Sequence, residues 1–459
     1  MAAVDGVRVW RITAADGEAM QRRVAASLRR RGLRAGDRVL LSVGTSPALL
    51  AAILGSLRSG VVPVVLNPAL VPAERAALVA DADPALVVDG DGALAALADG
   101  DDGYGDGGEL APFPLARPMH YTSGTTGRPK GVWSGVLDEA GAQAMFDDEG
   151  AVWSFSAADT VLVCSPLHHS APIRFAAGVL LRGGAVVLVE RFEPGAVRAA
   201  VEEHRPTVGF MVPSHLQRVF ADGADGERGA ERAGDAFDPS SFRLLAHAGE
   251  PCAPALKRRV IDAFPAGAVW EFYGSTEGQF TVCSPDEWIA RPGTVGRARP
   301  GRVLTVDDGG QIWCRVPEWA RFEYWRDAEK TAAAWRGDAF TVGDVGRIDD
   351  DGFLYLDGRR DDLIISGGVN VYPAEVEAAL AGVGGVGELA AFGAPDDRWG
   401  QRVCVAVVGT YDEVALRAAA RERLAPYKRP KDVYRIDELP RTGTGKVRRS
   451  AIAAALGLV

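Results

Sequence analysis

Short apolar strands alternate with helical patterns in two stretches of this sequence. In the first, strands are predicted at 38–43 and 61–66 on either side of a helix over 46–59. Strands separated by helices favour βαβ units and a mainly parallel sheet covered by helices. The second stretch has the same order, with strands at 161–167, 185–190 and 207–212, part of a helix at 176–181 and a helix at 194–204. We therefore expect the α/β fold class, with a large N-terminal domain of mainly parallel sheets flanked by helices.

The pattern changes in the last third of the chain. After Gly301 come short strands whose connections, DDGG at 307–310 and DDDG at 349–352, are hairpin signals. After Arg359 a strand at 403–408 lies between helical patterns at 373–380 and 414–424. We expect a small β-barrel-like subdomain, and then a small mobile α+β domain. The predicted boundaries are 1–360 for the N-terminal domain and 361–459 for the C-terminal one.

Composition excludes several classes of protein. The chain has 51 Lys and Arg and 61 Asp and Glu, a formal charge of −10, which argues against binding to nucleic acid. The five cysteines are scattered without a C-x-x-C pair, which favours reduced thiols in the cytoplasm. The N-terminus shows no signal peptide, and no uninterrupted apolar run of about 18 residues predicts a membrane span.

One segment stands out for its chemistry, YTSGTTGRPKG at 121–131. It combines three glycines with hydroxyl side chains and a lysine, so several backbone N–H groups, hydroxyls and one ammonium can point at a single anion. A polar turn without special purpose is the alternative. The candidate phosphate-binding residues are Thr122, Ser123, Gly124, Thr125, Thr126, Gly127 and Lys130.

This segment resembles the phosphate loop of the adenylate-forming superfamily, which includes acyl- and aryl-CoA ligases, peptide-synthetase adenylation domains and beetle luciferases. The resemblance implies ATP and Mg²⁺ as cofactors and CoA as co-substrate. A second hallmark follows at 273–277, YGSTE. By resemblance, Tyr273 and Gly274 belong to the nucleotide site, Thr276 binds the α-phosphate, and Glu277 is the metal ligand, a role that suits a hard carboxylate oxygen.

Further motifs of that superfamily follow in the expected order. Residues 247–251 (HAGEP) resemble the adenine-contacting loop, with Ala248 in place of its first glycine, followed by Gly249 and Glu250. In the TVGD segment, Asp344 is the expected acceptor for the ribose hydroxyls. By the same resemblance, Arg359 matches a position that contacts the ribose or a phosphate.

The C-terminal motifs are expected to serve movement and the second half-reaction. Asp361 matches the position at which the small domain of the superfamily pivots, and Gly367 and Gly368 match the loop that lines the pantetheine path in CoA ligases. Lys446 in PRTGTGKV matches the catalytic lysine, which offsets the negative charge that builds up when a carboxylate attacks a phosphate.

The acid itself is less constrained by the sequence. His169 in SPLHHS matches the gate between the acyl and nucleotide pockets, with a merely packed histidine as the alternative. This segment has no aspartate to hold an α-ammonium group, which favours a plain carboxylate, aryl or aliphatic, over an α-amino acid.

The function expected from these motifs is ATP-dependent conversion of a small carboxylic acid to an acyl-adenylate and pyrophosphate, followed by transfer to CoA. AMP replaces oxide as leaving group, which is why the acid must first be adenylated. Two alternatives stay open: transfer of an activated acid or oxyacid to a carrier protein or an amine, and a non-catalytic binding relative. A homodimer is possible.

Overall fold

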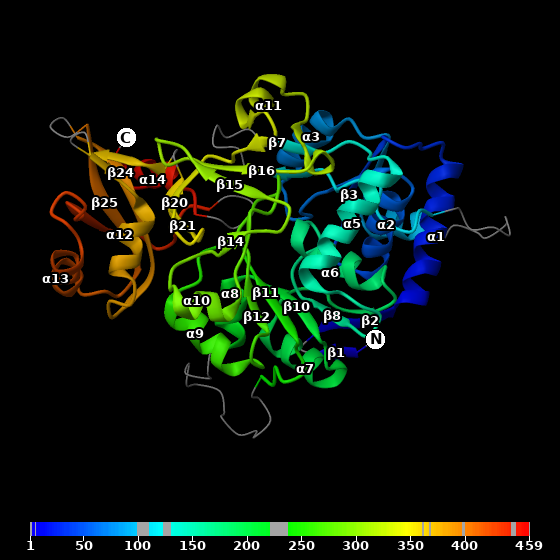
Figure 1. Cartoon of the computed structure of the whole chain (residues 1–459), viewed down its shortest axis with the longest axis horizontal. Helices are drawn as coiled ribbons and strands as arrows, with labels where there is room; N and C mark the ends of the chain where they lie inside the picture. The colour runs from blue at the N-terminus through cyan, green and yellow to red at the C-terminus, as the bar shows by residue number, and fades with distance from the viewer. Residues whose placement is uncertain are drawn as a thin grey trace. The chain divides into compact units, whose positions relative to one another are not determined.

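The computed structural model describes residues 2–4, 6–98, 110–122, 130–220, 237–359, 362–366, 369–396, 400–441 and 447–458. The chain forms two compact units (Figure 1). Unit 1 comprises residues 1–122, 129–303 and 315–340, and unit 2 comprises 123–128, 304–314 and 341–459. Hydrophobic clusters of buried side chains occur in each unit.

The largest sheet of unit 1 has seven strands in the order β1-β2-β9-β8-β10-β11-β12. Their bounds are Ala2–Val4, Val7–Thr13, Ala185–Val189, Thr160–Val163, Val208–Met211, Leu244–His247 and Val269–Glu271. The five strands from β9 to β12 in this order run parallel, β2 joins β9 antiparallel, and β1 pairs antiparallel with β2 at the edge. The carboxyl ends of β8, β10, β11 and β12 therefore lead into loops on the same edge of the sheet.

Helices cover both faces of this sheet. One hydrophobic cluster includes side chains of α6 (Ser170–Leu180), and the cluster on the other face includes those of α7 (Pro194–His204), α8 (Pro213–Val219) and α9 (Pro254–Ala263). Every residue of β9 is buried. A strand buried on both faces needs apolar side chains throughout, which explains the unbroken AVVLV run.

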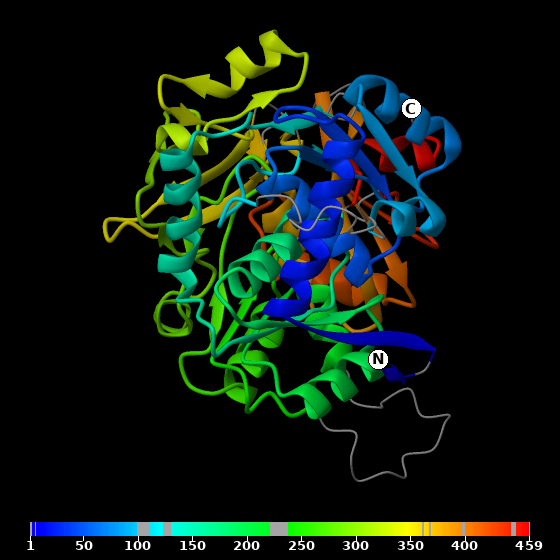
Figure 2. The same ribbon diagram turned by 90° about the vertical axis from the view of Figure 1, so that its right-hand side faces the viewer.

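A second parallel sheet of unit 1 has the order β4-β3-β5, with bounds Val62–Val65, Arg38–Ser42 and Leu86–Asp89. Its strands and α1 (Ala14–Arg30) and α2 (Pro47–Arg58) share one cluster with the large sheet. Figure 2 shows α1 in dark blue crossing unit 1. Thr13 and Asp16 form a capping box at the start of α1, and Ser46 caps α2 through the N–H of Leu49. The expected α/β fold class is confirmed.

Residues 89–109 are rich in Gly and Asp, a composition that predicts a flexible acidic surface segment. That prediction is wrong in part, because residues Asp91–Ala98 form helix α4. Leu94 and Leu97 lie one helical turn apart and are buried in the shared cluster, so apolar burial stabilises the helix despite its acidic surroundings. Residues 99–109 lie outside the described residues, and so do residues 221–236 of a second segment, 221–238, which the sequence predicts to be a surface loop.

Small antiparallel elements of unit 1 carry much of the predicted site. Strands β17, β7 and β6 form a sheet in that order, with bounds Glu323–Tyr324, Lys130–Trp133 and His120–Thr122. Strand β13 (Thr281–Val282) pairs with β14 (Arg297–Ala298), and β18 (Trp335–Arg336) pairs with β19 (Ala339–Phe340). The remaining helices of unit 1 in the described ranges are α3 (Pro72–Ala82), α5 (Glu139–Trp153), α10 (Pro285–Ala290), η1 (Glu318–Ala320) and α11 (Ala328–Ala334).

Both expected hairpins form in the last third of the chain. Strands β15 (Val303–Val306) and β16 (Ile312–Arg315) are neighbours, and the N–H of Gly310 donates to the Asp307 carbonyl at 2.8 Å. Strands β20 (Asp344–Ile348) and β21 (Leu354–Arg359) pair antiparallel around a turn in which the N–H of Gly352 donates to the Asp349 carbonyl at 2.9 Å. Glycine supplies the positive φ at residues 310 and 352.

The rest of unit 2 is a mixed sheet with the path β23-β22-β25-β24, to which β26 adds in parallel beside β25. These strands span Val369–Val371, Ile364–Ser366, Gly400–Gly409, Val386–Asp396 and Asp432–Arg435. One cluster includes residues of α12 (Pro373–Leu380) and α13 (Glu413–Arg423), and another includes residues of α14 (Ile452–Ala455), which follows the short helix η3 (Arg449–Ala451). This part of unit 2 has the expected α+β character.

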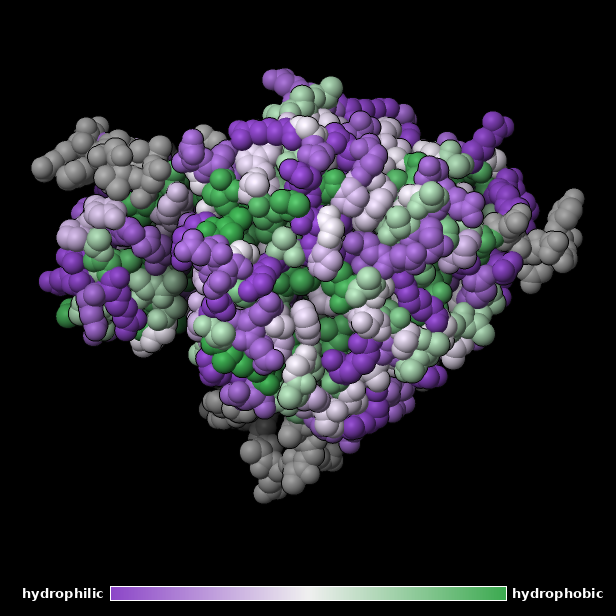
Figure 3. Space-filling view, viewed as in Figure 1, coloured by the Kyte–Doolittle hydropathy of each residue, from purple (hydrophilic) through white to green (hydrophobic). Residues whose placement is uncertain are grey.

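Figure 3 shows how polar and apolar residues are distributed on one face of the surface. On the face of unit 1 in Figure 3, hydrophilic and apolar residues are interspersed. In the described part of the chain, no helix combines the length and apolar character that crossing a membrane requires.

Candidate functional site

The glycine-rich segment is closed at its base by two paired strands. Thr122 ends β6 and Lys130 begins β7, and the two residues are register partners in this antiparallel pair. The pairing brings the two ends of the segment together, as an anion-binding loop requires. The candidates Ser123, Gly124, Thr125, Thr126 and Gly127 lie outside the described residues.

Lys130 and Glu277 meet on either side of a tyrosine. The ammonium of Lys130 lies 4.8 Å from the centre of the Tyr324 ring, a cation–π distance. The Tyr324 hydroxyl donates to Oε1 of Glu277 at 2.9 Å. Tyr324 reaches this place because its strand β17 pairs with β7, with Tyr324 opposite Val132. The structure therefore places Lys130 and Glu277 around one side chain, and Thr122 lies opposite Lys130 on the neighbouring strand.

Thr276 and Glu277 sit in a tight hairpin between β12 and β13. Gly274 and Gln279 bridge antiparallel across it, and the N–H of Ser275 donates to the Gly278 carbonyl at 2.8 Å. At its base, the N–H of Tyr273 donates to Oγ1 of Thr281 at 3.1 Å. This bonding holds the hallmark segment in one backbone conformation.

Charge around Glu277 is predominantly positive. Burial and the nearby Lys330 ammonium lower the pKa of Lys130, whereas Glu277 and Asp327 act against this shift. Arg117 donates from Nη1 to the Glu277 backbone carbonyl at 3.1 Å. Burial and two neighbouring guanidinium groups lower the pKa of Arg117 to about 10, so it stays a cation at neutral pH. Such a region favours the binding of a polyanion such as a nucleoside triphosphate.

The predicted adenine loop follows β11. Gly249 has φ +95°, a conformation in which a side chain is strained, and Ala248 is buried. Oε1 of Glu250 accepts from the N–H of Ser214 at 2.5 Å, which ties this loop to the start of α8. The loops after β10 and β11 thus lie together at the carboxyl edge of the parallel sheet, where open α/β sheets bind ligands.

A group of histidines surrounds the predicted gate. His169 is the N-cap residue of α6, and its ring lies 4.4 Å from that of His168. Burial and two histidine neighbours, His169 and His120, lower the pKa of His168 to about 3. Burial likewise lowers the pKa of His215, whose ring stacks on Phe192 at 3.7 Å, to about 4. The described histidines beside His169 are therefore neutral at pH 7 and act as aromatic or polar surfaces.

Unit 2 carries the predicted ribose contacts. Asp344 and Arg359 are register partners at the open end of the β20–β21 hairpin. Paired positions in an antiparallel ladder are close neighbours, so the hairpin brings these two positions together. Gly367, Gly368 and Lys446 lie outside the described residues.

Glu277 has the character of a single protein ligand to a metal. Its side chain is a carboxylate, a hard oxygen donor, and the residue is 6% exposed. Among the described residues, no group of three or more His, Cys, Asp or Glu side chains is arranged to hold a metal ion. A magnesium ion that is carried mainly by phosphate oxygens and water needs only one or two protein carboxylates, and Glu277 fits that requirement.

Sequence reasoning missed Tyr324 and Arg117. No motif marks either residue, and they lie 47 and 160 positions from Glu277. The pairing of β17 with β7 and the packing of the segment before β6 bring them to the hairpin. An aromatic residue in a two-residue strand gives no sequence signal for this role.

Comparison with protein families gives two matches. The family model described as AMP-binding enzyme matches residues 2–106 and 118–321. The model described as AMP-binding enzyme C-terminal domain matches residues 375–446.

Characterised proteins resemble the chain over most of its length. A feruloyl-CoA synthase from Amycolatopsis sp is 34% identical over 478 residues, covering 95% of this chain and 92% of the relative. A long-chain-fatty-acid–CoA ligase from Mycobacterium tuberculosis is 30% identical, with 96% and 92% covered. The structure of o-succinylbenzoate coenzyme A synthetase from Bacillus subtilis, in complex with ATP and magnesium ion, superposes with a TM-score of 0.81 at 25% identity, covering 96% and 94%.

Proposed function

This chain belongs to the AMP-binding enzyme family and is an AMP-forming acid–CoA ligase, and from that premise we propose which residues carry its two half-reactions. In the first, the carboxylate of the acid attacks the α-phosphorus of ATP, forming an acyl-adenylate and releasing pyrophosphate. In the second, the thiol of CoA displaces AMP. ATP and Mg²⁺ serve the first step, and CoA is the acceptor in the second.

In the proposed assignment, Glu277 holds the magnesium ion. When bound, this ion neutralises phosphate charge and makes pyrophosphate a better leaving group. The observation that carries the proposal is the meeting of Lys130 and Glu277 at Tyr324, with Thr122 opposite Lys130 on the next strand. Tyr324 orients the Glu277 carboxylate through its hydroxyl, while Lys130 adds a positive charge for the phosphates.

The remaining nucleotide contacts follow from the motifs. The loop residues Ser123, Gly124, Thr125, Thr126 and Gly127 would bind phosphate oxygens through N–H groups and hydroxyls. Thr276 would bind the α-phosphate. Tyr273, Gly274 and the segment Ala248-Gly249-Glu250 would contact the nucleoside, and Asp344 and Arg359 would hold the ribose.

The proposed C-terminal domain, residues 361–459, rotates about Asp361 between the two half-reactions. In one orientation it brings Lys446 to the acid and the α-phosphate. In the other it brings Gly367 and Gly368 to the pantetheine path. The order of the motifs along the chain supports this assignment, and the N-terminal domain would then end at residue 360.

Separate assays of the two half-reactions test these roles. Lys446→Ala should lower acyl-adenylate formation by about 10²- to 10³-fold, since a preorganised charge is lost, and should largely spare thioester formation from a supplied acyl-adenylate. Gly368→Leu should do the reverse by obstructing the pantetheine path. Equal loss of both half-reactions in the Lys446 variant would contradict its proposed role.

We propose a plain carboxylic acid as substrate, with aryl acids as the first candidates. Two observations support an aryl acid. One relative is named feruloyl-CoA synthase. In this chain, the ring of Phe192 stacks on that of His215, which is close enough to the proposed gate residue His169 for the two histidines to interact electrostatically. The test is pyrophosphate release and thioester formation with cinnamic, benzoic, medium-chain and long-chain acids. A preference for aliphatic acids would reject the aryl proposal. Acid-dependent pyrophosphate release without a CoA thioester would point to a carrier protein or an amine as acceptor.

A cytoplasmic setting is also part of the proposal. ATP and CoA are cytoplasmic substrates, and all five cysteines are free thiols. Fractionation of cells that express the tagged chain tests this location, and recovery outside the cytoplasm would reject it. Size-exclusion chromatography with light scattering tests the possible homodimer.

A further inference from the structure

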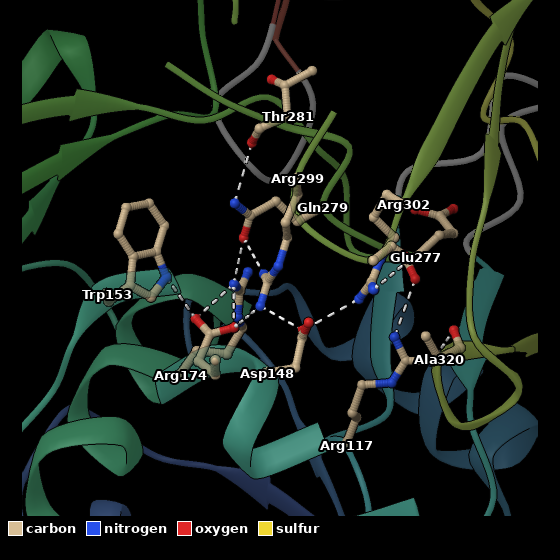
Figure 4. Close-up of polar contacts among 12 residues, drawn as sticks. Arg117, Asp148, Trp153, Arg174, Glu277, Gln279, Thr281, Arg299, Arg302 and Ala320 are labelled. Atoms are coloured by element: carbon tan, nitrogen blue, oxygen red, sulfur yellow. Dashed lines mark hydrogen bonds and ion pairs between the residues drawn. The ribbon is translucent and has the colours of Figure 1, made fainter. Parts of the chain in front are cut away.

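Buried and half-buried charged side chains surround the hairpin that carries Glu277 (Figure 4). They come from the segment before β6, from helices α5 and α6, and from the segment after β14. Their hydrogen bonds converge on the hairpin backbone and on the amide side chain of Gln279. We refer to these charged side chains, together with Gln279 of the hairpin, as the arginine–carboxylate network, made up of Arg117, Asp148, Glu149, Arg174, Gln279, Arg299 and Arg302.

Gln279 is the hairpin side chain to which the arginines of the network are hydrogen-bonded. Its Oε1 accepts from Nη2 of Arg174 at 2.6 Å and from Nη1 of Arg299 at 2.7 Å. Its Nε2 donates to the Thr281 carbonyl at 3.2 Å. Gln279 is 6% exposed. A buried amide bound from three directions has one available orientation, so the backbone two residues after Glu277 is held in place.

Two neighbouring carboxylates of α5 hold the arginines. Nη2 of Arg174 donates to both oxygens of Glu149, at 2.7 and 2.8 Å. Nη2 of Arg299 donates to Asp148 at 2.6 Å and to Glu149 at 3.1 Å. Burial alone would raise the pKa of Glu149, but Arg174 and Arg299 outweigh it and lower the pKa to about 2. The carboxylate therefore stays ionised throughout the working pH range.

Arg117 holds the other side of the hairpin. Besides the Glu277 carbonyl, it donates from Nη2 to the Ala320 and Arg321 carbonyls at 3.2 and 2.8 Å, and from Nε to Oγ of Ser134 at 3.0 Å. The guanidinium thus joins the hairpin to the segment before β17 and to the residue after β7. Lys130 belongs to β7 and Tyr324 to β17, so Arg117 helps to hold the backbones that carry these two side chains in fixed positions relative to the hairpin.

The network contributes little net free energy to the stability of the fold. Desolvation of buried ions cancels much of their attraction, and well-packed apolar side chains often stabilise a protein as well or better. The network does supply fixed direction, because planar guanidinium groups bind at defined angles. The hydrogen bonds that its arginines make with the hairpin reach the Glu277 backbone carbonyl and the Gln279 side chain.

We propose that the arginine–carboxylate network is the positioning device for Glu277, with Gln279, Arg299 and Arg117 as positioning residues of the adenylation half-reaction. This inference rests on the proposed role of Glu277. A rigid hairpin holds that carboxylate where magnesium-bound phosphate must meet it, whereas the second half-reaction proceeds after pyrophosphate has left. Loosening the network should therefore impair adenylation selectively.

Gln279→Leu is the first variant to make, because it removes the shared acceptor while Arg174 and Arg299 keep their carboxylate partners. We expect acid-dependent exchange of pyrophosphate into ATP to fall by about 10- to 100-fold, as misplaced catalytic groups do. The magnesium concentration for half-maximal exchange should also rise. Thioester formation from a supplied acyl-adenylate should stay within about twofold of the parent chain.

A matched control is available in the same unit. Arg243 is bound to the buried carboxylate of Asp159, at 2.8 and 2.6 Å, and takes no part in the network. Arg243→Lys should lower thermal stability and leave the ratio of the two half-reactions unchanged. If Gln279→Leu does not fold, Arg299→Lys keeps the charge but loses the second donor, and it should show the same selective loss to a smaller degree.

The following outcomes decide the question. Adenylation within twofold of the parent in a folded Gln279→Leu or Arg299→Lys variant overturns the inference, and so does equal loss of both half-reactions. Glu277→Gln, measured in parallel, separates this result from the proposed function. If Glu277→Gln adenylates normally, the assigned role of Glu277 fails. If it loses adenylation while the network variants keep it, only the positioning inference fails.

Discussion

At the scale of single residues, Tyr324 shows how a side chain outside every motif enters the site. Its hydroxyl is 2.9 Å from Oε1 of Glu277 and its ring is 4.8 Å from the Lys130 ammonium. One side chain thus touches both charges that the proposed phosphate site needs. A hydrogen bond to a charged group contributes about 1.5–3 kcal/mol, enough to matter for catalysis.

Tyr324→Phe should accordingly lower kcat/KM for ATP in the adenylation step by about 10- to 100-fold, since the lost bond oriented a charged oxygen. The ring remains, so the cation–π contact with Lys130 and the fold should remain. Pyrophosphate exchange measures the effect and thermal unfolding checks the fold. Tyr355→Phe makes the same change at a hydroxyl that donates to Oδ2 of Asp349 at 3.3 Å, and it serves as a control. Unchanged ATP kinetics in Tyr324→Phe would refute the orienting role.

At the scale of elements, the hairpin between β12 and β13 depends on a glycine at its narrowest point. A Cβ on Gly274 would lie 2.7 Å from the Gly278 carbonyl oxygen and 2.8 Å from Cα of Gln279. Both are backbone atoms, so the clash can only be relieved by opening the hairpin. The glycine of this motif thus has a steric reason in addition to any contact with the nucleotide.

Gly274→Ala should therefore reduce adenylation at least tenfold and destabilise the chain by about 1–3 kcal/mol. Gly296→Ala is the comparison: a Cβ there would lie 2.0 Å from the Val282 carbonyl oxygen, outside the Glu277 turn. Gly296→Ala should lower the free energy of unfolding at least as much as Gly274→Ala does. For the same loss of stability, it should reduce adenylation less. Urea unfolding and pyrophosphate exchange at a temperature where both variants are folded provide the two measurements. An equal loss of activity in both would contradict the hairpin argument.

At the scale of the whole molecule, buried histidines make unit 1 sensitive to acid. His247 is 1% exposed, and neither ring nitrogen has a partner among the described residues. Burial and the Lys257 ammonium lower its pKa well below the usual 6.5. The folded state thus keeps a neutral ring, whereas the unfolded chain binds a proton below about pH 6.5. Stability is complete above that pH and is lost as the pH falls toward the folded-state pKa.

His247→Leu should remove that dependence because leucine cannot be protonated. Each such histidine contributes a slope of about 1.4 kcal/mol per pH unit, so the variant should lose about 2 kcal/mol less than the parent chain between pH 6.5 and pH 5. Chemical unfolding at several pH values, with fixed ionic strength, measures the slope. Parallel stability curves for the two chains would show that His247 does not titrate on unfolding.

The sequence by itself determined the parallel α/β architecture, because strands buried on both faces must be apolar throughout and their helices must be amphipathic. The unbroken AVVLV run of β9 and the helix at 194–204 both follow from this local requirement. It also determined the order of the chemical motifs, since glycines, hydroxyls and carboxylates at fixed spacing are written directly in the chain. Helix α4 was missed because its stability comes from burying Leu94 and Leu97 against distant elements.

Only the tertiary structure decided which distant side chains meet around Glu277. The contacts of Tyr324, Arg117 and Arg299 with the hairpin depend on sheet pairing and helix packing, and neither leaves a periodic or compositional trace in the sequence. Hydrogen bonds act over about 3 Å, whereas positions in the sequence constrain only near neighbours. For that reason the motif residues could be named in advance, while the charged groups that hold them in place became visible only in the folded chain.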